Sequence, residues 1–107
     1  MMQGIQVIIS FMDLFELVKS KRSDILNLAG KYGANNVRIF GSVARGTSND
    51  QSDIDFLVDF NADASLLDWS GFWLDLSDLL ERDVDVATEK SLKARYREKV
   101  LAEALPL

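Results

Sequence analysis

Residues 53–60 read DIDFLVDF and form the clearest predicted β-strand of the chain. Every second side chain is apolar, which predicts a buried face made of Ile54, Phe56, Val58 and Phe60. The opposite face carries Asp53, Asp55 and Asp59, with Leu57 among them. Residues two apart on a strand are about 6–7 Å apart at Cα and point the same way. Asp53 and Asp55 can therefore converge on one or two Mg²⁺ ions.

A Gly-Ser turn lies upstream, with ten residues between Ser42 and Asp53. It follows a short predicted strand over residues 36–40. Gly41 lets the backbone approach a phosphate, and Ser42 can donate a hydrogen bond to it. Ser42 is also well placed to cap a short helical turn through Arg45. Arg45 either reaches a phosphate or neutralises the acidic site, with the second role slightly favoured.

A third carboxylate comes from a predicted strand over residues 83–87. Val84 and Val86 form its buried face, which leaves Asp83 and Asp85 on the other face. Asp85 is the better candidate because it lies inside the strand, between the two valines. It would complete the shell of a second ion and accept or orient the proton of an attacking hydroxyl.

These groups meet if the three strands lie side by side with their polar faces on one surface. An Asp-x-Asp pair alone is more often a solvated strand edge than a metal site. Three like charges on one surface cost stability unless cations are present, and this favours a functional role. The predicted nucleotidyl-transfer site has catalytic and metal-binding residues Asp53, Asp55 and Asp85, and nucleotide-binding residues Gly41, Ser42 and Arg45.

Amphipathic helices alternate with these strands. They are expected over residues 13–32 with a break near Ser20 or Ser23, over residues 66–80, and over residues 91–104 with Ser91 as the N-cap. The middle helix has an apolar stripe of Trp69, Phe72, Trp73, Leu76, Leu79 and Leu80. The expected fold class is α/β (α+β), a small mixed β-sheet packed against helices.

The length of 107 residues and the hydrophobic share of 48% fit one domain, assigned to residues 12–107. Residues 1–11 are expected to be a flexible extension or the product of an upstream start, with Met12 as the alternative first residue. They are too short to span a bilayer and make a poor signal peptide. We therefore expect a soluble cytoplasmic protein without a membrane partner.

The composition excludes several chemistries. The chain has no histidine and no cysteine, so zinc hydrolysis, Ser-His-Asp catalysis and thiolate metal sites are ruled out. The net charge of −5 and the acidic segment over residues 47–89 make nucleic acid an unlikely direct partner. The basic cluster Lys93, Arg95 and Arg97 is more often a solvated helix face than a contact surface.

Three segments together resemble the polymerase-β-type nucleotidyltransferase superfamily: GSVARG at residues 41–46, SDID at 52–55 and VDV at 84–86. The resemblance is closer to its minimal nucleotidyltransferase (MNT) branch, and it runs from about Leu14 to Leu105. It implies the polymerase-β-like nucleotidyltransferase fold, with ATP as substrate and two Mg²⁺ ions. By this resemblance Gly41 and Ser42 bind the phosphates, and Asp53, Asp55 and Asp85 bind the metal.

The MNT resemblance also implies a partner. MNT proteins are antitoxins that transfer AMP from ATP to a tyrosine of a HEPN-type ribonuclease toxin. Larger relatives bind their acceptor with an added helical domain, and this sequence shows no such segment, so the partner is expected to complete the site. One alternative is a non-catalytic antitoxin that neutralises the toxin by direct binding. A weaker one is transfer to RNA or to a small molecule.

Overall fold

The fold is a four-stranded mixed sheet with helices on both faces. A computed structural model describes residues 13–107, so the expected N-terminal extension and the alternative start at Met12 lie outside the described residues. The strand order is β3-β2-β1-β4, made of Val84–Ala87, Ile54–Phe60, Ala34–Phe40 and Leu105–Pro106 respectively. β1 is antiparallel to both of its neighbours, and β2 is parallel to β3. The predicted mixed α+β class is confirmed.

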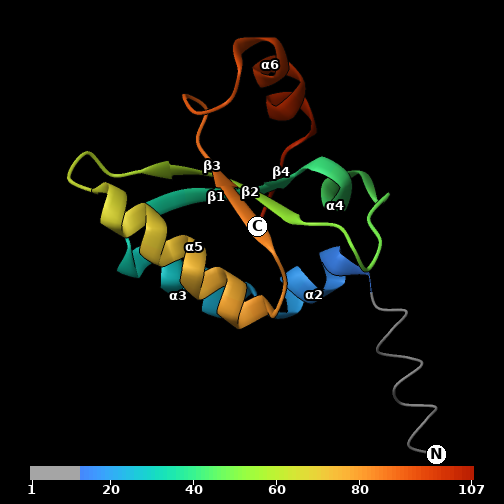
Figure 1. Cartoon of the computed structure of the whole chain (residues 1–107), viewed down its shortest axis with the longest axis horizontal. Coiled ribbons are helices and arrows are strands. Elements are labelled where there is room, and N and C mark those ends of the chain that lie inside the picture. Colours follow the sequence, from blue (N-terminus) through green and yellow to red (C-terminus); the bar gives the residue numbers. More distant parts are fainter. Residues whose placement is uncertain (1–12) are drawn as a thin grey trace, which may run out of the picture.

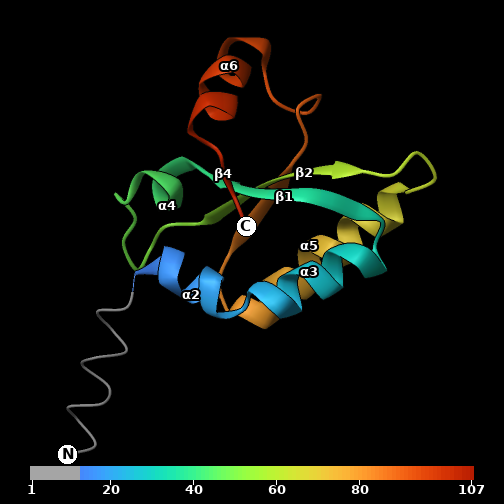
Figure 2. The ribbon, with the colours of Figure 1, turned by 180° about the vertical axis from the view of Figure 1, so that it is seen from behind.

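The helices are divided unequally between the two faces of the sheet (Figures 1 and 2). One face is covered by α2 (Leu14–Ser20), α3 (Arg22–Lys31) and α5 (Leu66–Leu80). The opposite face carries α6 (Ala94–Glu103), and the short α4 (Gly41–Arg45) follows directly on β1. The expected break in the first helix falls at Lys21, between the two serines proposed for it. None of the helices within residues 13–107 is long and apolar enough to cross a membrane.

The main core lies between the sheet and the three-helix face. Its centre is the alternating face of β2, whose Ile54, Phe56 and Val58 are fully buried, as the sequence predicts. They pack with Val37 and Ile39 of β1 in one hydrophobic cluster. From α5 the cluster receives Phe72, Leu76 and Leu80, whereas Trp73 of the predicted stripe is exposed. Trp73 was therefore placed wrongly in the buried stripe.

A second, smaller core lies under α6 on the other face of the sheet. Leu57 of β2 and Ala87 of β3 are buried there against Val100 of α6. Leu57 belongs to the predicted polar face, where the simple alternation predicts exposure. It is buried because Ala87 of β3 and Val100 of α6 pack against it on that face.

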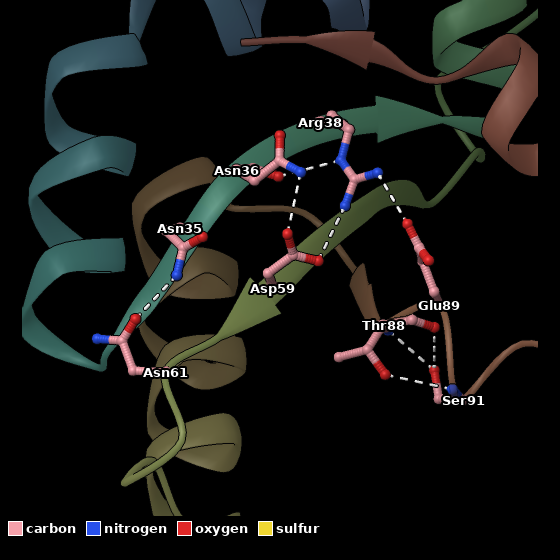
Figure 3. Close-up of polar contacts among 8 residues, drawn as sticks. All are labelled: Asn35, Asn36, Arg38, Asp59, Asn61, Thr88, Glu89 and Ser91. Atoms are coloured by element: carbon pink, nitrogen blue, oxygen red, sulfur yellow. Dashed lines mark hydrogen bonds and ion pairs between the residues drawn. The ribbon is translucent and has the colours of Figure 1, made fainter.

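Polar contacts fix the segment that leads into α6 (Figure 3). Arg38 of β1 forms ion pairs with Asp59 at 3.3 Å and with Glu89 at 3.7 Å. The Ser91 hydroxyl accepts a hydrogen bond from the Thr88 N–H at 2.9 Å and donates to the Thr88 carbonyl at 2.9 Å. The two hydrogen bonds close a turn over residues 88–91, and the ion pair between Glu89 and Arg38 anchors this turn to β1.

At the C-terminal end of the chain, one prediction was wrong and one strand was not predicted. Ser91 does not cap α6, because the helix begins three residues later, at Ala94, with Lys93 at the N-cap. The residues after α6 form an additional strand, β4, in which Leu105 pairs with Ile39 of β1. Pro106 is tolerated there because β4 is a sheet edge, where a missing N–H does not interrupt a ladder.

The burial of Leu57 can be tested by substitution. Leu57→Ala should lower the free energy of unfolding by about 3 kcal/mol, because it leaves a cavity under α6. Leu67→Ala is the matched control, since Leu67 is 83% exposed and its truncation should change stability by less than about 0.5 kcal/mol. Urea denaturation of both variants checks this. Equal, small losses would mean that α6 does not cover Leu57 in solution.

Candidate active site

Two of the predicted carboxylates lie side by side on neighbouring strands. Asp55 of β2 and Asp85 of β3 are register partners in the parallel pair, so they sit at the same level of the sheet and on the same face. Both are half-buried. Asp53 precedes the first residue of β2 and is exposed. The structure thus brings Asp55 and Asp85 together, with Asp53 at the solvent end of the same face.

Asp83, the competing candidate, occupies a different position. It precedes β3 and its side chain is exposed. Its backbone carbonyl accepts a hydrogen bond from the Ile54 N–H at 3.1 Å, which ties the start of β3 to the start of β2. Because Asp85 and not Asp83 is level with Asp55, the strand register favours Asp85 as the third member of the site.

Gly41 connects the end of β1 to this acidic pair. Phe40, the last residue of β1, is the register partner of Asp55, so the chain turns at Gly41 directly beside the Asp55 carboxylate. Gly41 has a positive φ of 72°, a conformation that L side chains rarely adopt. A Cβ at this position would also overlap with Oδ2 of Asp55. The glycine is therefore required by Asp55 itself, and not only by an approaching phosphate as the sequence suggested.

The Gly41 turn leads directly into the short helix α4. The helix begins at Gly41, so its N-cap is Phe40, and the expectation that Ser42 caps it was wrong. Ser42 instead lies within the first turn, half-buried, where the N–H groups of a helix have no partner inside the helix. Its carbonyl accepts a hydrogen bond from the Thr47 N–H at 3.0 Å. The hydroxyl and amide of Ser42 are thus held at the start of α4.

Arg45 is tied to a residue that the sequence analysis did not single out. Its guanidinium forms an ion pair with Glu103, the last residue of α6, at 3.1 Å. Glu103 also accepts a hydrogen bond from the Gly41 N–H at 3.0 Å. No periodic signal in the sequence links Glu103 to residues about 60 positions earlier, which is why it was missed.

The acidic surroundings change the protonation of Asp55. Burial raises the pKa of the Asp55 carboxyl from its ordinary 3.8 to about 6, and the charges of Asp85 and Asp53 add to this effect. Arg45 opposes the rise in the Asp55 pKa, and Glu103 reinforces it. The ionised form of Asp55 is therefore disfavoured unless a cation lies near it.

The oxygen donors at this end of the sheet suit a hard divalent cation. Carboxylates are ligands that Mg²⁺ prefers, and the mutual repulsion of Asp53, Asp55 and Asp85 would be relieved by a bound cation. Within residues 13–107, no three acidic side chains converge closely enough, as they stand, to enclose one metal ion. The donor set fits Mg²⁺ in its chemistry, and ligation by all three carboxylates would require their side chains to move closer together.

Comparisons with known proteins show the family and the fold of the chain. A family model described as a nucleotidyltransferase domain matches residues 27–107. MntA of Thermococcus cleftensis, a protein adenylyltransferase, is 36% identical over 78 residues, which cover 73% of this chain and 80% of that relative.

Solved structures show the same fold. A candidate minimal nucleotidyltransferase superposes with a TM-score of 0.80 and 45% identity, covering 92% of this chain and 99% of that one. The structure of a toxin–antitoxin with AMP-PNP superposes with a TM-score of 0.66 and 22% identity, covering 78% of this chain and 69% of that one. The second likeness concerns the fold alone. The minimal nucleotidyltransferase fold predicted from the sequence is confirmed.

The requirement for glycine at position 41 is testable with a matched pair of variants. Gly41→Ala should displace the Asp55 carboxylate and lower nucleotidyl transfer at least about 100-fold, because a small misplacement of a reacting group costs that much. Gly46→Ala is the control, since Gly46 has a similar φ of 74° but open space around it. Both variants carry the strain of a positive φ, and steady-state kinetics should show a large loss of transfer for Gly41→Ala alone. Equal losses would mean that backbone strain, not contact with Asp55, explains the glycine.

The raised pKa of Asp55 predicts a pH-dependent stability. The folded state binds this proton more tightly than the unfolded state, so ionisation of Asp55 lowers stability as the pH rises from about 4 to above 6. Asp55→Asn should therefore raise the free energy of unfolding at pH 8 by about 1 kcal/mol, a value reduced for solvent screening of this partly exposed group. At pH 4 the gain should disappear.

Denaturant unfolding at the two pH values measures this effect. Asp63→Asn, a substitution in an exposed turn, serves as the control and should change stability little at either pH. A variant Asp55→Asn that is no more stable than the wild type at pH 8 would contradict the crowding of carboxylates described above.

Proposed function

Because this chain belongs to the nucleotidyltransferase domain family, we propose that it is a Mg²⁺-dependent protein adenylyltransferase that acts as an antitoxin. The observation that carries the proposal is the level placement of Asp55 and Asp85 beside the Gly41 turn. The name of the Thermococcus cleftensis relative supports AMP as the transferred group. A toxin–antitoxin of the same fold is known with AMP-PNP, and we extend its antitoxin role and its adenine nucleotide to this chain as part of the proposal.

In this proposal the nucleotide binds at the end of the sheet. The Ser42 amide and hydroxyl donate hydrogen bonds to phosphate oxygens, and the Arg45 guanidinium contributes a positive charge. Asp53, Asp55 and Asp85 are the residues that would hold Mg²⁺. When bound, Mg²⁺ neutralises the triphosphate and stabilises the charge that develops on the attacking and leaving oxygens.

The proposed reaction is attack of an acceptor hydroxyl on the α-phosphorus of ATP. A bond forms between the hydroxyl oxygen and this phosphorus, and the bond between the α-phosphorus and the bridging oxygen to the β-phosphate breaks. Pyrophosphate leaves with that electron pair. The proton of the hydroxyl passes to the carboxylate of Asp85, which acts as general base. The acceptor becomes an AMP ester.

We propose a tyrosine of a HEPN-type toxin as the acceptor. The MNT resemblance of the sequence implies this partner, and the position of the site is compatible with a protein acceptor. The carboxylates lie on a sheet face beside α6, with Asp53 exposed and the Arg45 side chain 46% exposed. A tyrosine on the surface of a partner protein can reach such a position without entering a deep cavity.

Isotope labelling tests the transfer. After incubation with Mg²⁺ and ATP labelled at the α-phosphate, the proposed HEPN-type toxin partner should carry label, whereas ATP labelled at the γ-phosphate should leave it unlabelled. Asp85→Asn should reduce labelling at least about 100-fold, because it removes a metal ligand and the proposed base. Asp83→Asn, on the same strand segment but out of register with Asp55, should retain most of the activity.

The double variant Asp53→Asn/Asp55→Asn separates catalysis from neutralisation by contact. Under the proposal it neither labels the toxin nor protects cells from it, although it folds and still binds the toxin. If it protects cells as well as the wild type does, the non-catalytic binding alternative is correct. Transfer of label to the toxin by this double variant would contradict the assignment of the site itself.

A further inference from the structure

Glu103 delivers a carboxylate to the site from the far end of the chain. Its Oε1 accepts the Gly41 N–H at 3.0 Å, and its Oε1 and Oε2 lie 3.2 and 3.1 Å from Nη1 of Arg45. The Glu103 side chain is only 17% exposed, whereas its partner Arg45 is 46% exposed. These two contacts replace part of the hydration that a mostly buried carboxylate loses.

The position of Glu103 is fixed on both sides along the chain. On one side, Val100 of α6 packs into the small core with Leu57 and Ala87. On the other side, Leu105 of β4 pairs with Ile39 of β1. The carboxylate is therefore held by a packed helix and a paired strand, and not by a loop that could swing away.

The contacts of Glu103 set the position of two groups that are proposed to bind phosphate, the backbone at the Gly41 turn and the Arg45 guanidinium. The hydrogen bond to the Gly41 N–H orients the backbone from which α4 begins, and with it the Ser42 amide and hydroxyl. Among residues 13–107, the contacts of Arg45 with Glu103 are made by Nη1 alone, and a guanidinium has further N–H donors on Nη2 and Nε. Arg45 is thus held by one nitrogen, and its Nη2 and Nε take no part in the contacts with Glu103.

Charge gives Glu103 a second role. Arg45 lies close enough to Asp55 for the two charges to interact. An arginine without a carboxylate partner beside three aspartates would be drawn onto them and would compete there with a metal ion. Pairing with Glu103 holds Arg45 at the turn and away from the aspartates.

We propose that Glu103 is a positioning residue for nucleotide binding, which fixes the Gly41 turn and holds Arg45 in place to receive phosphate. This inference rests on the proposed function, because it presumes that a nucleotide binds beside the Gly41 turn. In this proposal α6 and β4 hold Glu103 in place and so form part of the framework of the site.

Binding measurements with non-hydrolysed probes test this role. Calorimetry of the full chain with Mg²⁺ and AMP-PNP, and separately with Mg²⁺ and tripolyphosphate, should show affinity about tenfold or more lower for Glu103→Ala. The loss should be of similar size for both probes, because Glu103 acts through the phosphates. Glu103→Gln should lose less affinity, since its amide oxygen still accepts the Gly41 N–H. Glu98→Gln, a change at an exposed glutamate of the same helix, should leave binding unchanged.

A double-variant cycle distinguishes positioning from a loss of stability. Because Glu103 and Arg45 act through each other, adding Glu103→Gln to Arg45→Gln should weaken binding less than Glu103→Gln does in the wild type. Thermal unfolding of each variant, followed by circular dichroism, must show a folded protein at the binding temperature. A structural role alone would lower the melting temperature and leave the affinity of the folded protein unchanged.

Each remaining outcome has one meaning. Wild-type affinity in Glu103→Ala would overturn the positioning role. Tighter binding in that variant would also overturn it, because Glu103 would then compete with phosphate for the Gly41 N–H and Arg45. If the wild-type chain itself binds neither probe, the proposed function fails, and that result is distinct from a failure of Glu103 alone.

Discussion

The pairing of β2 with β3 is the constraint on which the site depends. Ile54 and Phe56 of β2 are level with Val84 and Val86 of β3, and all four side chains are buried in the main core. The same register places Asp55 level with Asp85 on the opposite face. A slip by one residue would turn the aspartates into the core. The hydrophobic face therefore holds two repelling carboxylates together, a contact that would otherwise be avoided.

The small core under α6 divides the polar face of the sheet into two ends with different electrostatics. At one end, the side chain of Arg38 is largely buried and forms ion pairs with both Asp59 and Glu89 (Figure 3). At the other end, the positive charge of Arg45 is already matched by Glu103. Within the described residues, none of the three aspartates there forms an ion pair, and Arg45 acts on Asp55 only through its more distant charge. This difference in charge balance, more than the number of carboxylates, makes the second end a place for an external cation.

The features that could be predicted from sequence are those with a local signal. The period of two over residues 53–60 gave the buried and acidic faces of β2, and the helical period gave α5 with its observed ends. The burial of Leu57 depends on α6, which comes some 40 residues later and leaves no mark on the alternation. The strand β4 has two residues, too few for any period, and the contact of Glu103 with Gly41 joins residues that are 62 positions apart. Such contacts follow from packing and not from pattern.

The features of this structure that cost stability lie together at one end of the sheet. That distribution favours catalysis over the alternative in which the chain neutralises a toxin by binding alone. Gly41 adopts a left-handed conformation against Asp55, Asp55 faces Asp85 at a raised pKa, and Glu103 is a mostly buried charge. Each of these lowers stability or depends on a specific partner, and natural sequences retain such arrangements mainly at functional sites. A protein that acted only by binding would need a surface complementary to its partner, and the exposed face of any helix could supply one. It would have no use for half-buried carboxylates that repel one another beside a glycine turn.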